Sequence, residues 1–528
     1  MQAQLVAPKE YNITDEWMKS SIPQDRLAIV SENEEGNVTT RTYGELRTRI
    51  NKIGNAFSKL GLHKGDVILL LLPRGITAYE VYGGALKLGL VIIPSSEMLR
   101  EKDILYRIEH SDAKAIIVHD QFAKAFEEMN LPDTLTKCVV GGHTNSGFGH
   151  NISVLMEEES SDWHQPKTNR DDLAFLSYTS GTTGNPKAVM HTHSWGYAHI
   201  RTAASGWMGI QEADRVWATA GPGWQKWIWS PFLSVLGSGA TGYLYEGKFD
   251  PYAYLAFLKK HAIQVLCCTP TEYRLMAKDK RISEFSLPHL RSAVSAGEPL
   301  NMEVIHLFKR LFNVNVRDGY GQTENTLLLG FMEDTPLLPG AMGKPTPGNW
   351  VEVVDEDGTP CLIGEVGHIA VHKSTPALFK GYFRDKERTE RQYRGDFYLT
   401  GDKARKDEEG YFWFEGRSDD IIISSGYTIG PFEVEDALTQ HPAVQECAVI
   451  ASPDPDRGNI VKAYVVLVEK QKMPEEELVT LLQNHVKELT APYKYPRKIE
   501  FVRELPKTTS GKIRRVELRK WDLETLNQ

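Results

Sequence analysis

The sequence contains no long apolar segment and no recognisable targeting segment. Its longest unbroken apolar run, residues 67–72, is far shorter than the roughly 20 residues that a membrane-spanning helix requires. The first residues, 1–10, do not combine a basic segment with an apolar one, so we expect no signal peptide. These absences predict a cytoplasmic protein without a membrane span.

Cysteine is scarce, and there is no excess of positive charge. The five cysteines have neither CxxC nor metal-ligand spacing, and an odd number is unlike a secreted disulfide framework, so we expect reduced thiols. The formal net charge is -9, whereas binding to a nucleic-acid backbone needs a basic face. The charge therefore argues against general nucleic-acid binding, although local basic patches remain compatible with it.

The chain does have considerable length and an ordinary globular composition. Of its 528 residues, 41% are apolar and 25% are charged. A prior of about 150 residues per domain predicts roughly three or four structural units. Internal repeats and low-complexity segments are absent from the sequence, so each unit has to be predicted from its own pattern.

Short apolar runs alternate with helical patterns in the first part of the chain. Helices are predicted over residues 42–60, 76–88 and 101–110, because apolar residues recur there at helical spacing. The intervening strand-like runs are residues 67–72, 91–93 and 115–118. Such alternation indicates βα units and parallel sheets that are covered on both faces.

A loop rich in glycine and hydroxyl groups follows the apolar run 173–177. It reads Tyr178-Thr-Ser-Gly-Thr-Thr-Gly-Asn-Pro-Lys187. Glycines let backbone N–H groups approach an anion, hydroxyls add donors and a lysine adds positive charge, so the loop suits a phosphate. A polar surface loop between two strands is an equally good interpretation at this point. A Walker A loop is excluded, because Asn185-Pro186 separates Gly184 from Lys187.

Two more polar loops follow strand-like runs. Gly297-Glu-Pro299 follows residues 292–296, and Gly319-Tyr-Gly-Gln-Thr-Glu324 follows residues 314–316. Ligands of open α/β sheets bind at the carboxyl ends of strands. A carboxylate beside phosphates, such as that of Glu324, is normally tolerated when it holds a metal ion, and Mg²⁺ takes oxygen ligands. The three loops together favour one ligand site.

Tryptophan is concentrated in one segment. Four of the eleven tryptophans fall in the thirteen residues from Trp217 to Trp229. Aromatic rings of this kind line apolar ligand pockets, but they equally often pack in a core or an interface. Both interpretations stay open at this point.

The pattern changes from about residue 351 onward. Short strands separated by glycine-containing turns predict a β-rich subdomain, with Gly401-Asp402 and Gly416-Arg-Ser-Asp-Asp420 in its turns. The end of the chain predicts a small α+β unit with helices over residues 433–441 and 475–489. Its last loop, residues 506–515, is basic, and charge alone favours a solvated surface segment.

In this order the motifs resemble those of the adenylate-forming superfamily, which comprises acyl-CoA synthetases, nonribosomal-peptide adenylation domains and luciferases. The resemblance covers about residues 40–520 and rests on the 178–187 loop, Tyr320-Gly-Gln-Thr-Glu324, Thr400-Gly-Asp402, Gly416-Arg-Ser-Asp-Asp420 and Pro506-Lys-Thr-Thr-Ser-Gly-Lys512. Ser295-Ala-Gly-Glu-Pro-Leu300 and Ser424-Ser-Gly-Tyr-Thr-Ile-Gly-Pro-Phe-Glu-Val-Glu435 are most similar to the medium-chain acyl-CoA synthetase branch.

The resemblance implies an α/β fold with two domains. The large N-terminal domain, residues 1–417, would hold two parallel-type βα sheet subdomains and the β-rich subdomain. The small, mobile α+β C-terminal domain, residues 418–528, would turn about a hinge at Asp419.

The implied activity is that of an ATP-dependent, AMP-forming acid–CoA ligase. Such enzymes convert a carboxylic acid to an acyl-adenylate and pass the acyl group to coenzyme A. A carboxylate is a poor electrophile until AMP becomes its leaving group, so catalysis is mainly positioning and charge neutralisation at the α-phosphate. The expected partners are a small carboxylic acid, ATP with Mg²⁺, and coenzyme A, bound by a monomer or small homo-oligomer.

The resemblance also carries residue roles onto this chain. Lys512 would bridge the acid and the α-phosphate, Thr323 would bond the α-phosphate, Tyr320 would stack on adenine, and Asp402 and Arg417 would bind the ribose. The implied catalytic residues are Lys512, Thr323, Glu324 and Lys187, with Glu324 as the metal ligand. The implied ATP and AMP contacts are Thr179, Ser180, Gly181, Thr182, Thr183, Gly184, Lys187, Gly297, Glu298, Pro299, Asp318, Gly319, Tyr320, Gly321, Gln322, Thr323, Asp402, Arg417 and Lys512. The implied coenzyme A tunnel includes Gly426 and Tyr427, and the implied acyl pocket includes Trp224, Lys226 and Trp227.

The chain departs from the family pattern at Thr428, where Gly-Tyr-Arg or Gly-His-Arg is usual; Arg457 could supply the missing cation, and neither residue is assigned a role. The expected acid is medium-chain, branched or aromatic. Acetate is disfavoured, because relatives that use acetate carry a tryptophan where this chain has Tyr320-Gly321.

Two other functions compete with this one. A stand-alone adenylation enzyme would load its acid onto a carrier protein instead of coenzyme A. A nucleotide-binding regulatory protein without turnover would share the fold, but the complete set of catalytic residue types argues against it.

Overall fold

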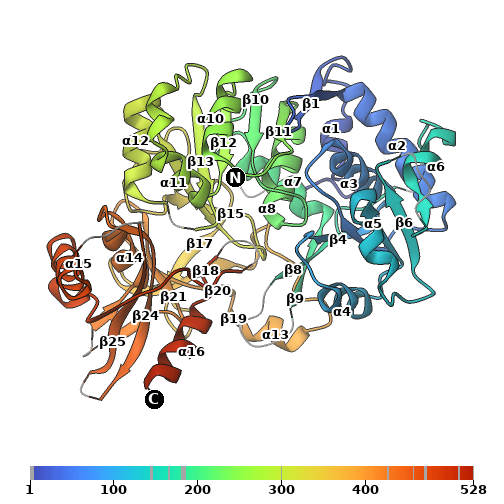
Figure 1. Cartoon of the computed structure of the whole chain (residues 1–528). Helices are drawn as coiled ribbons and strands as arrows, with labels where there is room; N and C mark the ends of the chain where they lie inside the picture. The colour runs from blue at the N-terminus through green and yellow to red at the C-terminus, as the bar shows by residue number, and fades with distance from the viewer. Residues whose placement is uncertain are drawn as a thin grey trace.

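The computed structural model describes residues 5–142, 147–164, 167–179, 186–298, 300–424, 427–455, 457–468, 473–508 and 512–526, and the backbone alone at Thr428. In this part of the chain the strands form five sheets. Figure 1 shows the two largest sheets with their helices above, and the C-terminal elements as a separate group below them. The predicted α/β fold, with a large N-terminal region and a smaller C-terminal domain, is confirmed.

The first large sheet contains the loop that was predicted to bind phosphate. Its strand order is β7-β6-β5-β3-β4-β8-β9, and all neighbours are parallel except β8 and β9. The strands are β3 (Val67–Leu71), β4 (Val91–Ser95), β5 (Ala115–His119), β6 (Thr136–Val140), β7 (His150–Asn151), β8 (Leu173–Thr179) and β9 (Lys187–Thr192). Because Thr179 pairs with Lys187, the loop joins the two strands of an antiparallel hairpin.

The second large sheet has the order β16-β15-β14-β13-β12-β10-β11-β1-β2. Its strands are β1 (Leu27–Glu32), β2 (Val38–Thr42), β10 (Arg215–Ala218), β11 (Thr241–Tyr245), β12 (Val265–Cys268), β13 (Ser292–Ala296), β14 (Val316–Gly321), β15 (Leu327–Gly330) and β16 (Lys344–Pro345). Strand β1 was not predicted, and it pairs in parallel with β11 from far along the chain. The N-terminal segment therefore belongs to the second sheet, although the first sheet follows it in sequence.

The main core lies between these two sheets. Alternate residues of a single strand are buried on opposite faces: Ile68 and Leu70 of β3 belong to the shared core, whereas Leu69 and Leu71 face an outer cluster. This double burial explains why the strands are apolar throughout. The shared core also takes side chains from α2 (Tyr43–Lys59), α3 (Ile76–Leu88), α7 (His193–Ala203) and the π-helix η2 (Ile228–Ser234).

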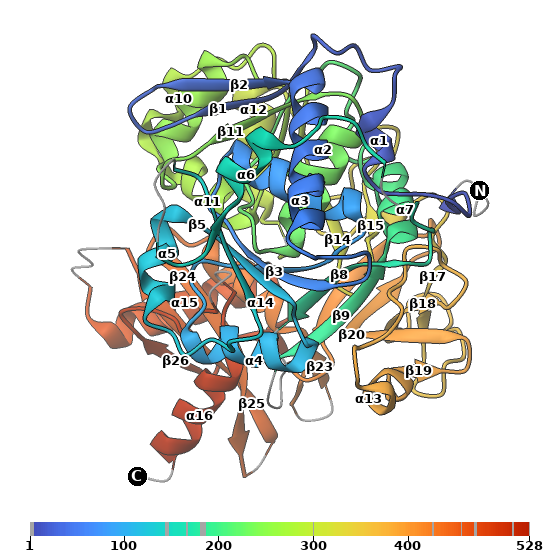
Figure 2. The same ribbon diagram turned by 90° about the vertical axis from the view of Figure 1, so that its right-hand side faces the viewer.

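The remaining helices of this region lie on the outer faces or in connections, or add single side chains such as Trp17, Ile152 and Val235 to the shared core. They are α1 (Asp15–Met18), α4 (Glu101–Ser111), α5 (Asp120–Glu127), α6 (Ile152–Glu158), α8 (Gln225–Trp227), α9 (Val235–Gly237), α10 (Pro251–Lys260), α11 (Pro270–Lys278), η3 (Lys280–Glu284) and α12 (Met302–Phe312). Figure 2 shows α2 and α3 beside α6, and α4 near the end of the β8–β9 hairpin. No helix in the described ranges is long and apolar enough to cross a membrane.

The β-rich subdomain is an antiparallel sheet, as predicted. It contains β17 (Val351–Val354), β18 (Val366–His372), β19 (Tyr393–Arg394), β20 (Phe397–Lys406) and β21 (Phe412–Arg417), with α13 (Lys386–Arg391) at its edge. The prediction of a turn at Gly401-Asp402 is wrong, because this pair lies inside β20; of Gly416-Arg-Ser-Asp-Asp420, the first two residues end β21 and the last three form a turn. Gly401 and Gly416 have positive φ, and the pairing shifts register beside them, so these glycines mark a bulge.

The C-terminal unit, residues 422–526, has its own core and the predicted α+β character. It contains β22 (Ile422–Ser424), β23 (Tyr427–Ile429), α14 (Pro431–Thr439), β24 (Val444–Asp454), β25 (Gly458–Leu467), α15 (Glu475–Leu489), η4 (Pro492–Lys494), β26 (Lys498–Phe501) and α16 (Arg515–Leu526). It contacts the second sheet's helices, where Asn301 Nδ2 donates to Asp436 Oδ1 at 3.0 Å. Polar contacts of this kind allow two units to separate more easily than a shared apolar core would.

Candidate active site

The predicted site residues converge where several strands end. Gly297 and Glu298 follow the carboxyl end of β13, and residues 318–321 form the end of β14. The β8–β9 hairpin approaches from the first sheet, because Phe379 N donates to Glu324 O while Lys380 N donates to Met190 O of β9. The carboxyl ends of parallel strands therefore bring together residues from both sheets, as expected for an α/β ligand site.

Lys187 and Glu324 form a compact polar group with Tyr382. Lys187 Nζ lies 2.6 Å from Glu324 Oε1 and 2.8 Å from the Tyr382 hydroxyl, which donates to the same Oε1 at 2.9 Å. Burial alone would raise the pKa of Glu324, but Lys187 and Tyr382 outweigh it and hold that pKa below its ordinary value. The group thus holds an ionised carboxylate beside a cation at the base of the hairpin.

Asp402 is the centre of a second polar group. The Tyr320 hydroxyl donates to Asp402 Oδ2 at 2.6 Å, and Gln322 Nε2 donates to the same oxygen at 2.7 Å. In the sheet, Asp402 of β20 lies opposite Arg417 of β21. Burial raises the pKa of Asp402, while Tyr320 and Arg417 partly offset that rise. These contacts fix one carboxylate at the edge of the cleft.

Lys512 of the C-terminal unit comes close to this group. Although the residue as a whole is exposed, the protein packed around its ammonium group lowers its pKa, and Arg417 and Lys226 act in the same direction. Glu298 and Asp402 oppose this effect by attracting the cation. Lys512 of the predicted basic loop therefore interacts with Glu298, Asp402 and Arg417, although the residue is exposed, as the solvated-segment interpretation expects.

Asp318 and Lys226 lie at the carboxyl ends of neighbouring strands, Asp318 in β14 and Lys226 beside the end of β13. Lys226 Nζ donates to Ala296 O of β13 at 2.6 Å. Asp318 Oδ1 accepts from Gly319 N at 2.9 Å, and burial raises the pKa of Asp318 to about 7. A carboxyl group of this kind changes its protonation near neutral pH, which is uncommon for aspartate.

A ladder of three rings, one from the end of β9 and two from α7, supports the Gln-Thr-Glu segment. His191, Trp195 and His199 are spaced four residues apart and stack in succession, with centroids 4.3 Å and 5.4 Å apart. His191 Nε2 lies 2.5 Å from Thr323 O, and Trp195 Nε1 donates to Asn325 O at 2.9 Å. Burial lowers the pKa values of His191 and His199 to about 4 and about 3, so both rings are neutral.

The tryptophan segment is packed within the protein, which agrees with the core interpretation that the sequence left open. Trp217 packs in an outer core with Tyr254, and Trp227 is buried with its ring stacked on Phe232 at 5.1 Å. A Cβ on Gly321 would lie 2.8 Å from Trp229 Cη2. Trp229 thus occupies the space beside Gly321 that a larger residue would need.

Buried polar atoms around the site fit a polar ligand. Within the described residues, Thr179 Oγ1, Gln322 Oε1 and Trp229 Nε1 are buried without a hydrogen-bond partner. Such atoms are uncommon in folded proteins and normally require a partner. Their position beside the two polar groups is consistent with a bound nucleotide and acid.

Some predicted site residues have their contacts away from these polar groups, and others lie outside the described residues. Tyr427 is 52% exposed and stacks on Tyr493 at 4.3 Å, so its contacts are with the C-terminal unit. Asp419 accepts from Arg417 Nε at 3.1 Å just after β21. Ser180, Gly181, Thr182, Thr183, Gly184, Pro299 and Gly426 lie outside the described residues.

Sequence reasoning missed Tyr382 and the ladder of rings, and it considered Trp229 only as part of the tryptophan segment. Tyr382 sits 195 positions from Lys187, and no local pattern links them. The ladder did have a signal, since aromatic rings recur every four residues at His191, Trp195 and His199, although His191 lies in β9 and only the other two lie on α7.

Comparison with known proteins agrees with this geometry. The family of AMP-binding enzymes matches residues 18–383, and the AMP-binding enzyme C-terminal domain matches residues 433–512. The chain therefore belongs to the AMP-binding enzyme family, as the resemblance predicted.

Individual relatives make the class of enzyme clear. The chain is 59% identical over 98% of its length to the uncharacterized acyl-CoA ligase YtcI of Bacillus subtilis (strain 168), of which it covers 97%. It is 39% identical over 97% of its length to mitochondrial acyl-coenzyme A synthetase ACSM3 of Rattus norvegicus, of which it covers 90%. The crystal structure of the anthranilate CoA ligase AuaEII in complex with anthranoyl-AMP superimposes with a TM-score of 0.90, at 29% identity and 99% coverage of both chains. The predicted class, an AMP-forming acid–CoA ligase that uses ATP and coenzyme A, is confirmed.

Proposed function

We propose that this enzyme activates a medium-chain, branched-chain or aromatic carboxylic acid and transfers the acyl group to coenzyme A. The observation that carries this proposal is the approach of Lys512 to Glu298, Asp402 and Arg417. A cation brought from the C-terminal unit to that place can neutralise charge on both reactants of an adenylation step.

In the first step a carboxylate oxygen of the acid attacks the α-phosphorus of ATP. The bond from that phosphorus to the bridging oxygen breaks, and pyrophosphate leaves with the electron pair. Lys512 would bridge the acid and the α-phosphate, and Thr323 would donate to the α-phosphate. Lys187, with Thr179 and the loop after it, would hold the outer phosphates. Tyr320 would stack on adenine, and Asp402 and Arg417 would bind the ribose.

Glu324 fits a role as magnesium ligand, because its carboxylate is ionised and lies beside Lys187, the lysine that would hold the outer phosphates. Within the described ranges no group of three or more His, Cys, Asp or Glu side chains could hold a metal. The ion would therefore take most of its ligands from the nucleotide and water, and it would supply neutralisation of phosphate charge.

The second step requires the C-terminal region to move. We place the domain boundary after Arg417, giving domains 1–417 and 418–528, with Asp419 as the hinge. Rotation would withdraw Lys512 and bring Gly426 and Tyr427 to the coenzyme A tunnel. The thiol of coenzyme A then attacks the acyl carbon, AMP leaves, and the thiol proton passes to solvent. Tyr427 is exposed in the present arrangement, which leaves it available for such a contact.

The acid pocket would be formed by Trp224 and Lys226, with Trp229 beside Gly321 and with Trp227 behind it. Aromatic walls with one polar group suit an apolar acid. We further propose a cytoplasmic enzyme, since all five cysteines are free thiols and four are buried.

The proposal is tested by measuring thioester formation with ATP, Mg²⁺ and coenzyme A across acetate, straight medium-chain, branched and aromatic acids. Pyrophosphate release is followed in parallel. We expect the highest kcat/KM with a medium-chain, branched or aromatic acid, and a loss of about 10²–10³-fold in adenylation for Lys512→Ala. A clear preference for acetate would contradict the acid pocket, and transfer to a carrier protein but not to coenzyme A would contradict the acceptor.

A further inference from the structure

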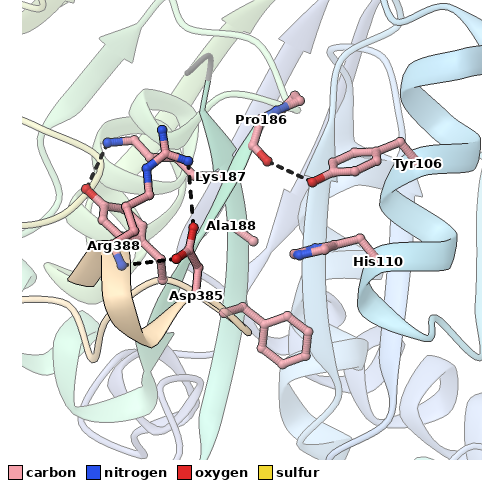
Figure 3. A pocket seen from close by; sticks show the side chains of 9 residues that line it. Tyr106, His110, Pro186, Lys187, Ala188, Asp385 and Arg388 are labelled. Carbon is pink, nitrogen blue, oxygen red and sulfur yellow. Dashed lines mark hydrogen bonds and ion pairs between the residues drawn. The ribbon is translucent and has the colours of Figure 1, made fainter. Parts of the chain in front are cut away.

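A cavity of about 170 Å³ lies on the outer side of the β8–β9 hairpin. Its walls come from β9, from α4 and from the segment that leads into α13. Figure 3 shows Lys187, Asp385 and Arg388 on one side of it and Tyr106 and His110 on the other. The cavity is several times larger than the roughly 30 Å³ that one water molecule occupies in the liquid.

The cavity is continuous with the polar group of the active site. Lys187 and Tyr382 line it, and the same two side chains contact Glu324 at 2.6 Å and 2.9 Å. An outer phosphate of a nucleotide that Lys187 holds would therefore border this cavity directly.

Its charged groups favour an anion. Lys187 and Arg388 are the cations of the lining, and Asp385 is its carboxylate. Arg388 Nη1 lies 3.8 Å from Asp385 Oδ2, and this is the guanidinium's only ion pair in the described part of the chain. A long single contact leaves most of its five N–H donors available, and arginine is well suited to bidentate contacts with phosphate.

The opposite wall adds polarity but no negative charge. His110 Nδ1 lies 2.8 Å from the Tyr178 hydroxyl, and burial together with Arg384 lowers the pKa of His110, so the ring is neutral at pH 7. The Tyr106 hydroxyl donates to Pro186 O at 3.2 Å and holds α4 against the hairpin. Asp385 is thus the one anionic side chain among the lining residues.

We propose that this cavity is a subsite for the product pyrophosphate, in which Arg388 receives the anion as it leaves Lys187. The inference rests on the proposed function, because pyrophosphate forms only when the α-phosphorus of ATP exchanges its bond to the bridging oxygen for a bond to the acid. No bond is made or broken in the cavity, and the anion only changes its contacts. The subsite would give pyrophosphate an exit on the side of the hairpin that faces α4.

The test is titration of the whole protein with sodium pyrophosphate, followed by calorimetry, together with the inhibition constant of pyrophosphate against ATP. We expect Arg388→Gln to weaken the binding of pyrophosphate and its inhibition against ATP by about tenfold each, which corresponds to the loss of one charge-assisted hydrogen bond. The KM for ATP should change less than about twofold. Arg388→Lys should restore part of the affinity. Asp385→Asn should tighten pyrophosphate binding, because it removes the negative charge and keeps a side chain that caps α13.

Arg391→Gln is the matched control. Arg391 lies on the same helix, is 71% exposed and pairs with Glu387 outside the cavity, so its loss should leave pyrophosphate affinity unchanged. Unaltered affinity in both Arg388→Gln and Asp385→Asn, or an equal loss for ATP and pyrophosphate, would overturn the proposal. The calorimetric titration contains no carboxylic acid, so it tests the pyrophosphate subsite independently of turnover. If no acid were turned over, the proposed function would be rejected, but the titration would still decide the subsite.

Discussion

Tyr382 is the residue that connects the expected phosphate cation to the expected metal ligand. Its hydroxyl accepts from Lys187 and donates to Glu324, and burial raises its pKa well beyond the neutral range. The hydroxyl therefore stays protonated and holds both side chains in one arrangement. It acts as a positioning residue, because its hydroxyl binds these two side chains and, at 3.4 Å, the hydroxyl of Tyr398.

We expect Tyr382→Phe to lower kcat/KM for ATP by about tenfold, since a buried carboxylate loses a hydrogen-bond donor at a cost of about 1–3 kcal/mol. The loss should be larger at limiting Mg²⁺, because Glu324 is no longer held in place. Steady-state kinetics over a range of magnesium concentrations measures this. Tyr393→Phe in the same subdomain is the control, since the Tyr393 hydroxyl has no hydrogen bond in the described residues. An equal magnesium dependence in Tyr382→Phe and the wild type would contradict the positioning role.

Helix α7 is the element that joins the tryptophan segment to the segment after Glu324. His199 Nδ1 lies 2.7 Å from Thr326 Oγ1, and His199 Nε2 lies 3.0 Å from Trp229 O. One ring therefore links the segment after Glu324 to the tryptophan segment. Burial keeps this ring neutral, as it does His191 and His193, whose pKa values are lowered to about 4.

These three histidines predict a loss of stability in acid. Each has a folded-state pKa below its ordinary value. Below about pH 6.5 the unfolded chain therefore binds protons that the folded chain does not bind. The stability they contribute is complete above pH 6.5 and is lost as the pH falls toward 4, at about 3 kcal/mol for each ring.

Urea unfolding between pH 8 and pH 4.5 measures this effect. We expect the free energy of unfolding of His199→Gln to fall less steeply below pH 6.5 than that of the wild type, by about 1.4 kcal/mol per pH unit. His306→Gln, at an exposed position of α12, should keep the wild-type slope. Equal slopes for His199→Gln and the wild type would show that His199 takes up its proton in the folded state.

For the whole molecule, the link after β21 is where we expect the C-terminal unit to turn between the two steps of the reaction. Asp419 is 44% exposed at its side chain and pairs with Arg417, one of the expected ribose ligands. Lys512 interacts with residues that we expect to bind the nucleotide, whereas Tyr427 stacks on Tyr493 within the C-terminal unit. Under the proposed hinge, this arrangement is the one expected for the adenylation step.

We expect Asp419→Pro to retain acid-dependent ATP–pyrophosphate exchange within about threefold but to reduce thioester formation by about 10²-fold, because proline fixes φ at the hinge. Asp419→Ala removes the carboxylate without fixing φ, so it should retain both activities more fully. Both rates are measured with the same acid. Normal thioester formation by Asp419→Pro would place the hinge elsewhere.

Much of the fold follows from local patterns in the sequence. The helix over residues 475–489 and the central strands were predicted closely, because periods of 3.6 and 2 reflect which faces are buried. Gly401-Asp402 was misplaced in a turn, since a glycine inside a strand at a bulge gives the same local signal as a glycine in a turn.

By itself the sequence determined the family, the class of reaction and the loops that carry its residues, because these depend on residue types at short spacing. Only the tertiary structure decided that β1 joins the second sheet, that Trp229 and not Trp227 lies beside Gly321, and that Tyr382 links Lys187 to Glu324. Such contacts join positions far apart in the chain. They are selected by the packing of whole elements, for which no short sequence pattern exists.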